Sequence, residues 1–261
     1  LDKGIVISHH RPFIPLMPLA ATAMNLGSDY DLILSSSAGY GKGFRHNGKS
    51  IHISYCHTPL RYAWENDKYF DWNIFLKLAS APVFWYLRKW DYYAGQKPKI
   101  MLANSKHIAK KIKDYYSRDA EVVYPPVDLK VFYRDFKIKK QGYFLAVGRM
   151  MKYKKFDLAI QAFNRLNLPL LVVGDGPELE NFKKMARSPK IHFLPFADEG
   201  QLRDLYNGAE ALIFPQVEDF GLVAAEAQAC GTPVIAFSEG GAREIVEDGV
   251  TGIFFHHQTV E

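Results

Sequence analysis

Short apolar runs alternate with longer amphipathic stretches along most of the chain. The runs are rich in Val, Ile, Leu and Phe without strict apolar–polar alternation, which is typical of parallel strands buried on both faces. Strands that alternate with helices predict an α/β fold with right-handed crossovers. The predicted strands are 31–36, 51–56, 100–103, 122–124, 143–147, 168–173, 191–194, 211–214, 234–237 and 252–255, and the clearest helices are 157–166, 178–186, 201–208 and 242–247.

A break in this pattern divides the chain into two α/β halves. Pro125-Pro126 interrupts any regular element, and the polar, Lys-rich stretch 135–141 precedes a new strand. The sequence therefore predicts two domains, 1–136 and 137–261, joined by a linker within 124–141.

Composition narrows the class of protein. With 261 residues and 48% hydrophobic residues the chain can bury real cores, which excludes disorder. No apolar run approaches the roughly 18 residues of a membrane span, and no signal peptide opens the chain. Cys56 and Cys230 have no metal-ligand spacing and no partners for a disulfide framework, which favours a reducing cytoplasm. The start at Leu1 and the end just after a strand-like run suggest a fragment of a longer protein.

Charge and aromatic residues set the first half apart. Residues 1–136 carry 19 Lys/Arg and 12 Asp/Glu, which gives +7, whereas residues 137–261 carry 14 and 16, which gives −2. Residues 62–94 interleave aromatic and basic positions, a pattern of helices at a membrane interface or of helices packed on a sheet through their aromatic faces. Both interpretations stay open. The aromatic residues are Tyr62, Trp64, Tyr69, Phe70, Trp72, Phe75, Phe84, Trp85, Tyr86, Trp90, Tyr92 and Tyr93.

Two carboxylates flank a predicted helix start in the second half. Glu218 lies in the loop after a strand and Glu226 in the first turns of a helix that begins near Gly221 or Leu222 and ends near Cys230. Free amides and the helix dipole at such a start suit a diphosphate at the carboxyl ends of the strands. Carboxylates accept well from vicinal hydroxyls, so the two side chains match the hexose and the ribose of a nucleotide-sugar.

Cations follow an earlier strand of the same half. Gly148 and Arg149 directly follow the strand 143–147, and Lys154 comes shortly afterwards. An Arg and a Lys at fixed reach stabilise the charge that develops on a leaving phosphate. The turn Gly174-Asp175 after the next strand allows close backbone approach and is expected to border the nucleotide, although a glycine turn alone is a weak motif.

In order along the chain stand Gly148-Arg149 with Lys154, Gly174-Asp175-Gly176-Pro177, Glu218 with Glu226 eight residues later, Gly231-Thr232-Pro233, Gly240-Gly241 and Gly249 with Gly252. This series resembles glycosyltransferase family 4, whose members are retaining enzymes with the GT-B fold of two Rossmann-like domains facing a cleft. The resemblance covers the second half almost completely. It implies that 137–261 binds a nucleotide-sugar and that 1–136 is an acceptor-side domain.

The resemblance also implies a role for each matching residue. Glu218 contacts the donor sugar, Glu226 binds the ribose, and Arg149 and Lys154 bind the diphosphate. The expected catalytic residues are His57, Arg149, Lys154 and Glu218; the expected nucleotide-binding residues are Gly148, Arg149, Lys154, Gly174, Asp175, Glu218, Phe220, Gly221, Leu222 and Glu226.

In the first half, His57 before Thr58-Pro59 resembles the donor-sugar histidine of the family. The run 55–64 further resembles bacterial O-antigen and other polysaccharide mannosyltransferases, as in lipopolysaccharide synthesis, which suggests GDP-mannose as donor. The family's N-terminal strand and Gly-rich loop have no counterpart here, so the first domain is expected to be incomplete. A lipid-linked glycan acceptor is expected, with peripheral contact at the inner face of the plasma membrane.

Alternatives remain beside this hypothesis. A sugar-nucleotide epimerase of the same fold is one, and a non-catalytic fragment that binds an anionic surface is the other. Nucleic acid is not an expected partner. No metal or other cofactor is predicted to be required, because Asp29-Tyr30-Asp31 is better explained as the turn into the strand 31–36 than as an Asp-x-Asp metal site.

Overall fold

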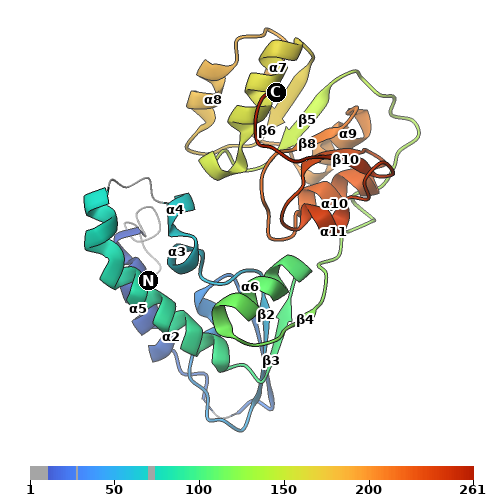
Figure 1. The fold of residues 1–261 in the computed structure, drawn as a ribbon. Helices are drawn as coiled ribbons and strands as arrows, with labels where there is room; N and C mark the ends of the chain where they lie inside the picture. Colours follow the sequence, from blue (N-terminus) through green and yellow to red (C-terminus); the bar gives the residue numbers. More distant parts are fainter. Residues whose placement is uncertain (1–10, 28, 70–73) are drawn as a thin grey trace. The chain divides into compact units, whose positions relative to one another are not determined.

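The computed structural model describes residues 11–27, 29–69 and 74–261. They form two compact units, which divide between Tyr124 and Pro125. Each unit contains one sheet whose strands are all parallel (Figure 1), so the predicted α/β fold is confirmed. The predicted strands and helices differ from the observed ones by at most two residues at either end.

The first unit has a four-stranded sheet in the order β1-β2-β3-β4. Its strands are β1 (Leu32–Ser37), β2 (Ile51–Cys56), β3 (Ile100–Ala103) and β4 (Glu121–Val122). The remaining elements are η1 (Arg11–Leu16), α2 (Met17–Ala23), η2 (Tyr40–Lys42), α3 (Arg61–Trp64), α4 (Asn66–Tyr69), α5 (Ile74–Gln96) and α6 (Lys106–Tyr116).

Helix α6 shows how the sequence builds this unit. The Ser105 hydroxyl accepts from Ile108 N at 3.0 Å and caps the start of the helix. Ile108, Ile112 and Tyr116, spaced four residues apart, share one face and are completely buried against the strands.

One prediction is wrong for this first sheet, because β1 is not buried on both faces. Leu32 and Leu34 are 56% and 67% exposed, whereas Ile33 between them is 8% exposed. Within the described residues, one face of β1 therefore lies against the core and the other is open.

The second unit is a doubly wound six-stranded sheet in the order β10-β9-β8-β5-β6-β7 (Figure 1). Its strands are β5 (Phe144–Val147), β6 (Leu170–Val173), β7 (Ile191–Leu194), β8 (Leu212–Phe214), β9 (Val234–Phe237) and β10 (Gly252–Phe255). The other elements are η3 (Lys152–Lys154), α7 (Phe156–Leu166), α8 (Leu179–Met185), α9 (Glu199–Gly208), α10 (Leu222–Ala229) and α11 (Ala242–Ile245).

Two cores cover the two faces of this sheet. Leu145 of β5 joins Tyr206 of α9 and Ala224 of α10 in one core. The next residue, Ala146, joins Phe156 of α7 and the buried side chains of α8 in the other. Successive residues of a strand point to opposite faces, so short strands without apolar–polar alternation are what this double burial requires.

The compact units divide between Tyr124 and Pro125, ahead of the predicted start of the second domain at residue 137. Phe132 is buried in the core beside α9. The Lys140 ammonium donates to Ala209 O at 2.5 Å and to the Thr232 hydroxyl at 2.9 Å. The segment expected to be a linker is therefore packed on the second unit from Pro125 onward.

Candidate functional site

The strand order of the second unit creates a point where chain connections leave in opposite directions. From β5 the chain continues to β6 and β7 on one side, and from β8 to β9 and β10 on the other. The loops that follow β5 and β8 therefore border the same position at the carboxyl end of the sheet. Open α/β sheets bind their ligands at such a switch point.

The loop after β5 carries the predicted cations. Gly148 has φ of 149°, and η3 is followed by Lys155, which adopts the left-handed conformation with φ of 57°. Arg149 is exposed, whereas the side chain of Lys154 is 15% exposed. The loop thus presents Arg149 to solvent and holds Lys154 against the site.

The loop after β8 supplies the partner of Lys154. The Glu218 carboxylate accepts a hydrogen bond from the Lys154 ammonium, and its side chain is also 15% exposed. The loop ends at Gly221, whose φ of 103° turns the chain into α10. This ion pair joins the two loops at the switch point, which the predicted site requires.

Glycines let the neighbouring loops approach closely. A Cβ on Gly174, after β6, would lie 2.0 Å from Gly148 O, and a Cβ on Gly241 would lie 2.1 Å from Phe220 O. The Asp175 carboxylate accepts from Gly176 N at 2.7 Å and so stabilises its own turn. Gly174 therefore lies against the loop of Gly148, and Asp175 is exposed beside it.

Glu226 lies one turn into α10. Its Oε2 accepts a hydrogen bond from the Tyr206 hydroxyl at 3.0 Å. Burial raises the pKa of Glu226, the bond from Tyr206 opposes that rise, and the charge of Glu199 adds to it. Of the other predicted nucleotide-binding positions, Phe220 is half-buried and Leu222, the first residue of α10, is 41% exposed.

His57 belongs to the first unit, directly after β2. Its Nε2 lies 2.8 Å from the Ser36 hydroxyl, and the Tyr55 ring stands edge-on to the imidazole with centroids 5.0 Å apart. His57 N also donates to Ser37 O at 2.8 Å, which extends the pairing of β1 and β2. The imidazole is thereby fixed at the carboxyl end of this sheet.

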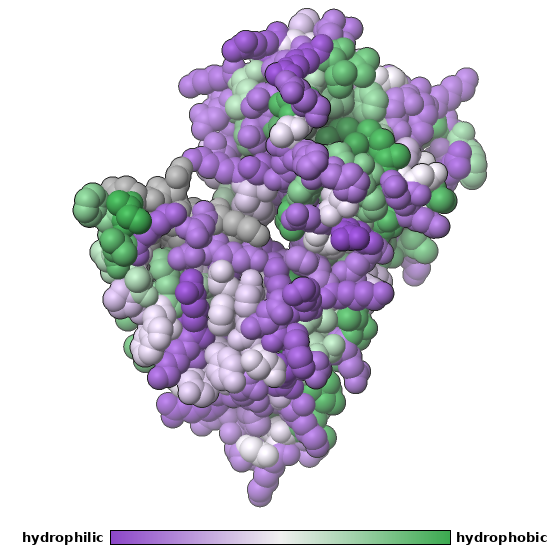
Figure 2. Space-filling model, viewed as in Figure 1, coloured by the Kyte–Doolittle hydropathy of each residue, from purple (hydrophilic) through white to green (hydrophobic). Residues whose placement is uncertain are grey.

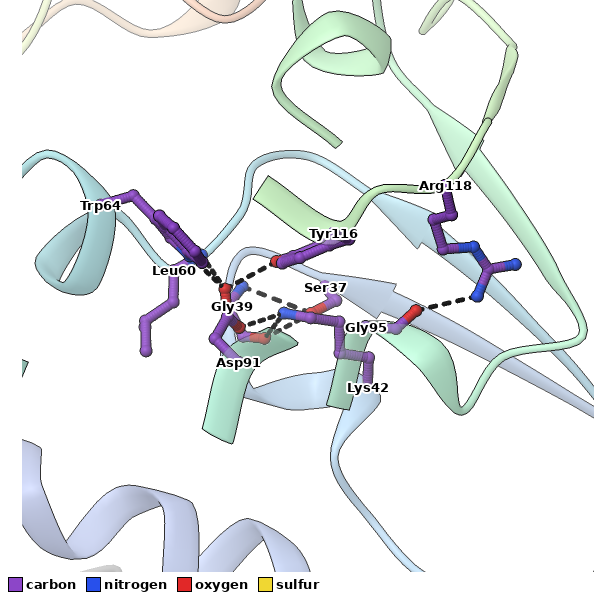
Figure 3. A network of polar contacts seen from close by, with 9 residues as sticks. All are labelled: Ser37, Gly39, Lys42, Leu60, Trp64, Asp91, Gly95, Tyr116 and Arg118. Atoms are coloured by element: carbon purple, nitrogen blue, oxygen red, sulfur yellow. Dashed lines mark hydrogen bonds and ion pairs between the residues drawn. The ribbon is translucent and has the colours of Figure 1, made fainter. Parts of the chain in front are cut away.

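A buried polar network underlies the loop of His57 (Figure 3). The Asp91 carboxylate of α5 accepts from Leu60 N at 3.2 Å, Trp64 Nε1 at 2.8 Å and the Tyr116 hydroxyl at 2.7 Å. Its other oxygen accepts from the Lys42 ammonium at 2.7 Å, which also donates to Gly39 O at 2.5 Å. One carboxylate therefore ties the loops after β1 and β2 to α5 and α6.

Sequence reasoning did not find Ser36, Asp91 or Tyr206. Each acts through a partner that is distant along the chain, and neither residue type nor spacing marks such pairs. The Asp31 carbonyl, directly before β1, accepts from Ile51 N at 2.9 Å and so begins the pairing of β1 with β2. Across the described ranges, no group of three or more His, Cys, Asp or Glu side chains is arranged to hold a metal ion.

Comparison with solved structures identifies the fold. Sucrose-phosphate synthase from Thermosynechococcus elongatus has a TM-score of 0.68 at 20% identity, covering 88% of this chain and 62% of that one. HepE of Anabaena, solved in complex with UDP and glucose, has a TM-score of 0.66 at 16% identity, covering 100% of this chain and 71% of that one. The chain has the GT-B glycosyltransferase fold, as the sequence predicted.

The second unit can be placed more narrowly. Residues 132–261 match the family model described as Glycosyl transferases group 1, so this part of the chain is a domain of that family.

Curated relatives agree with this placement. The D-inositol 3-phosphate glycosyltransferase of Geodermatophilus obscurus is 34% identical over 184 residues, which cover 59% of this chain and 41% of that protein. The enzyme of the same name from Mycolicibacterium smegmatis is 30% identical over 175 residues, covering 58% and 40%. The matched part thus spans only about two fifths of the length of these relatives.

Proposed function

We propose that the protein is a retaining glycosyltransferase that moves a hexose from a nucleotide-sugar to a glycan or lipid-linked glycan. The observation that carries the proposal is the Lys154–Glu218 pair at the switch point of β5 and β8, within a glycosyl transferases group 1 domain. A cation and a carboxylate held together there match a ligand that has a diphosphate beside a sugar.

In this proposal the diphosphate lies against the start of α10, between Arg149 and Lys154. Arg149 grips two phosphate oxygens, and Lys154 supplies a point charge. Both cations stabilise the leaving phosphate more strongly as its bond to the sugar breaks, so they lower the barrier by electrostatics. The missing side chain of Gly174 lets the loop after β6 pack against the loop of Gly148, because a Cβ there would lie 2.0 Å from Gly148 O.

The proposal assigns the sugars to carboxylates and to His57. Glu218 accepts from hydroxyls of the donor hexose, and Glu226 accepts from the ribose. His57, fixed by Ser36, is assigned to the donor sugar. The acceptor hydroxyl attacks from the face that the nucleotide leaves, and the leaving phosphate takes its proton, which gives retention. The proposed mechanism requires no metal ion.

GDP-mannose is the proposed donor, on the resemblance of residues 55–64 to polysaccharide mannosyltransferases. UDP-sugars are the competing donors, since HepE and a pneumococcal O-GlcNAc transferase were both solved with UDP. Calorimetric titration of the protein with GDP, UDP, GDP-mannose and UDP-glucose decides between them. The same titrations on Glu226→Ala test the ribose site.

We expect one nucleotide to bind and Glu226→Ala to weaken it at least tenfold, because a charge-assisted bond to a hydroxyl is lost. Failure of the protein to bind any of the four ligands would overturn the proposal. Incubation with the bound donor and no acceptor tests the epimerase alternative. An epimerised nucleotide-sugar in the products would favour that alternative over transfer.

Peripheral membrane contact is proposed for α5. Phe84 and Leu87 of this helix are buried, whereas Ile74, Phe75 and Leu78 are 62%, 78% and 66% exposed. Figure 2 shows apolar surface (green) over the first turns of α5, at the left of the view. The aromatic segment thus supplies both core and surface; Phe70 and Trp72 lie outside the described residues.

No helix in the described part of the chain is both long and apolar enough to cross a bilayer. The +7 charge of residues 1–136 favours an anionic surface. Co-sedimentation with phosphatidylglycerol vesicles at low salt tests the contact. Phe75→Ser/Leu78→Ser should abolish binding, and Phe196→Ser, which changes an exposed Phe of the second unit, should not.

A further inference from the structure

We propose that Tyr206 is a positioning residue for nucleotide recognition, whose hydroxyl orients the Glu226 carboxylate toward the ribose of the donor. This inference rests on the proposed function, in which Glu226 binds the ribose. Neither the motifs of the chain nor its resemblance to a family assigns a role to Tyr206.

The contact itself is directional. The Tyr206 hydroxyl lies 3.0 Å from Oε2 of Glu226, across the packed helices α9 and α10. In the described part of the chain this bond engages Oε2 and leaves Oε1 to a ligand. A carboxylate that binds vicinal hydroxyls must hold its plane in a fixed orientation. A hydrogen-bond donor on the oxygen that does not contact the ligand, here Oε2, fixes that orientation.

The Tyr206 ring has no freedom to follow a moving carboxylate. It is completely buried, and the Phe132 ring meets it edge-on with centroids 6.0 Å apart. Its own carbonyl accepts from the Thr232 hydroxyl at 2.5 Å. The hydroxyl is therefore presented at a fixed point, which is what positioning by a rigid element requires.

Helix α9 is fixed at both ends. Asp198 and Gln201 form a capping box at its start. Near its end, the Asn207 amide accepts from Asp135 N at 2.8 Å and donates to Tyr133 O at 3.0 Å. Tyr206 stands next to this anchor, so a shift of its hydroxyl would require the last turn of the helix to move.

The same contacts set the protonation states of Tyr206 and Glu226. Burial and the neighbouring Glu226 charge raise the pKa of Tyr206, so its hydroxyl remains a donor throughout the working range. Burial raises the pKa of Glu226, the Tyr206 bond lowers it, and the charge of Glu199 raises it. Burial and the charge of Glu226 in turn raise the pKa of the neighbouring Cys230 thiol. Removal of the hydroxyl should therefore raise the pKa of Glu226 further.

The test compares Tyr206→Phe with wild type, using the nucleotide-sugar that binds and its 2′-deoxyribose counterpart. A sugar diphosphate diester does not itself titrate between pH 4 and 8, so the pH profile of affinity reports on the protein. We expect Tyr206→Phe to weaken the ribonucleotide on the order of tenfold and the deoxy compound much less. We also expect the acid limb of the affinity profile to move to higher pH.

Two further variants provide controls. Tyr143→Phe removes another half-buried hydroxyl, which donates to Leu205 O of α9, and should leave both the discrimination and the pH profile unchanged. Phe132→Leu keeps the Tyr206 hydroxyl but loosens its ring, and should reduce the discrimination by a smaller factor; this keeps the test decisive if Tyr206→Phe does not fold.

The outcomes separate the two levels of the proposal. If wild type binds nucleotide and Glu226→Gln weakens it while Tyr206→Phe changes neither discrimination nor pH profile, the role of Tyr206 is overturned and the proposed function stands. A lower melting temperature alone would likewise overturn it, because that is a structural effect. If no nucleotide binds to wild type, both proposals fall.

Discussion

The Lys42 ammonium lies 2.7 Å from the Asp91 carboxylate, and both side chains are completely buried. The two residues stand 49 positions apart and join η2 to α5. Because Asp91 also accepts from Leu60, Trp64 and Tyr116, the pair is the centre of the first unit's polar core. A buried charge is tolerated only when it is paired and hydrogen-bonded in this way.

Removal of either side chain of the Lys42–Asp91 pair should therefore destabilise the fold strongly. Lys42→Met leaves the buried Asp91 carboxylate without its cation and should cost about 3–5 kcal/mol in the free energy of unfolding. Urea denaturation measures this loss. Lys49→Met, which alters an exposed lysine of the same loop, should change the stability by less than about 0.5 kcal/mol. Equal losses in the two variants would contradict the role of the pair.

The Lys154–Glu218 pair predicts a catalytic defect of a different kind. Lys154→Met removes a cation from the proposed diphosphate site and should lower kcat/KM by about 10²–10³-fold, the usual loss for one electrostatic contact to a leaving group. Lys152→Met, an exposed lysine of the same turn, should retain most of the activity. Initial rates of transfer with varied donor measure both. Full activity of Lys154→Met would remove this residue from the proposed mechanism.

Much of the second unit could be predicted because its signals are local. Gly221 turns the chain into α10, and Gly231, with φ of 74°, follows the end of that helix, which the sequence placed near Cys230. A strand, a glycine turn and a helix in series leave few alternatives in a doubly wound sheet. The position of Glu218 beside Lys154 follows from the strand order, once β5 and β8 are neighbours.

The rest depended on contacts that a sequence does not display. Tyr206 and Asp91 each look like ordinary helical residues, and only tertiary packing brings them to Glu226 and Lys42. The packing of the segment after Pro125 on the second unit was not visible in the sequence for the same reason: Phe132 is buried there, just ahead of a polar, Lys-rich stretch. The open face of β1 also escaped notice, because Leu32 and Leu34 look like core residues.

Close packing of the loops at Gly174 predicts a steric effect. A Cβ there would lie 2.0 Å from Gly148 O at φ of 137°, so Gly174→Ala should cost about 2–3 kcal/mol and displace the loop that carries Arg149. Gly249 has φ of 74° with no atom within 4 Å of its added Cβ, so Gly249→Ala should cost about 1 kcal/mol from backbone strain alone. Thermal unfolding compares them, and equal shifts would mean that the clash is relieved.

His52 predicts a pH dependence of stability. Burial, followed by the charges of His46, Lys97 and Arg118, lowers its pKa to about 4 from 6.5. Between pH 6.5 and 4, His52 therefore binds a proton in the unfolded chain and remains neutral in the folded chain. This contribution to stability is complete above pH 6.5 and is lost as the pH falls toward 4.

The loss should amount to about 2–3 kcal/mol across that window. Urea unfolding between pH 4 and 7 measures it, with His52→Gln as the comparison. The variant should show a flatter profile even if its stability at pH 7 is lower, since Ser35 loses its buried partner at 2.9 Å. A profile parallel to that of wild type would assign the acid sensitivity to other groups.

The hydrogen bond between Ser36 and His57 should affect the orientation of the imidazole and hardly affect the stability of the fold. The Ser36 hydroxyl lies 2.8 Å from Nε2 of His57 and is exposed, so its loss should leave the melting temperature almost unchanged. Without that bond the imidazole can rotate away from the donor sugar, and Ser36→Ala should lower kcat/KM by about 3–10-fold. Ser36→Thr keeps a hydroxyl at the same position and should restore most of the rate. Transfer kinetics at saturating acceptor compare wild type with Ser36→Ala, Ser36→Thr and His57→Ala. A full rate for Ser36→Ala together with a large loss for His57→Ala would show that the histidine acts without help from Ser36.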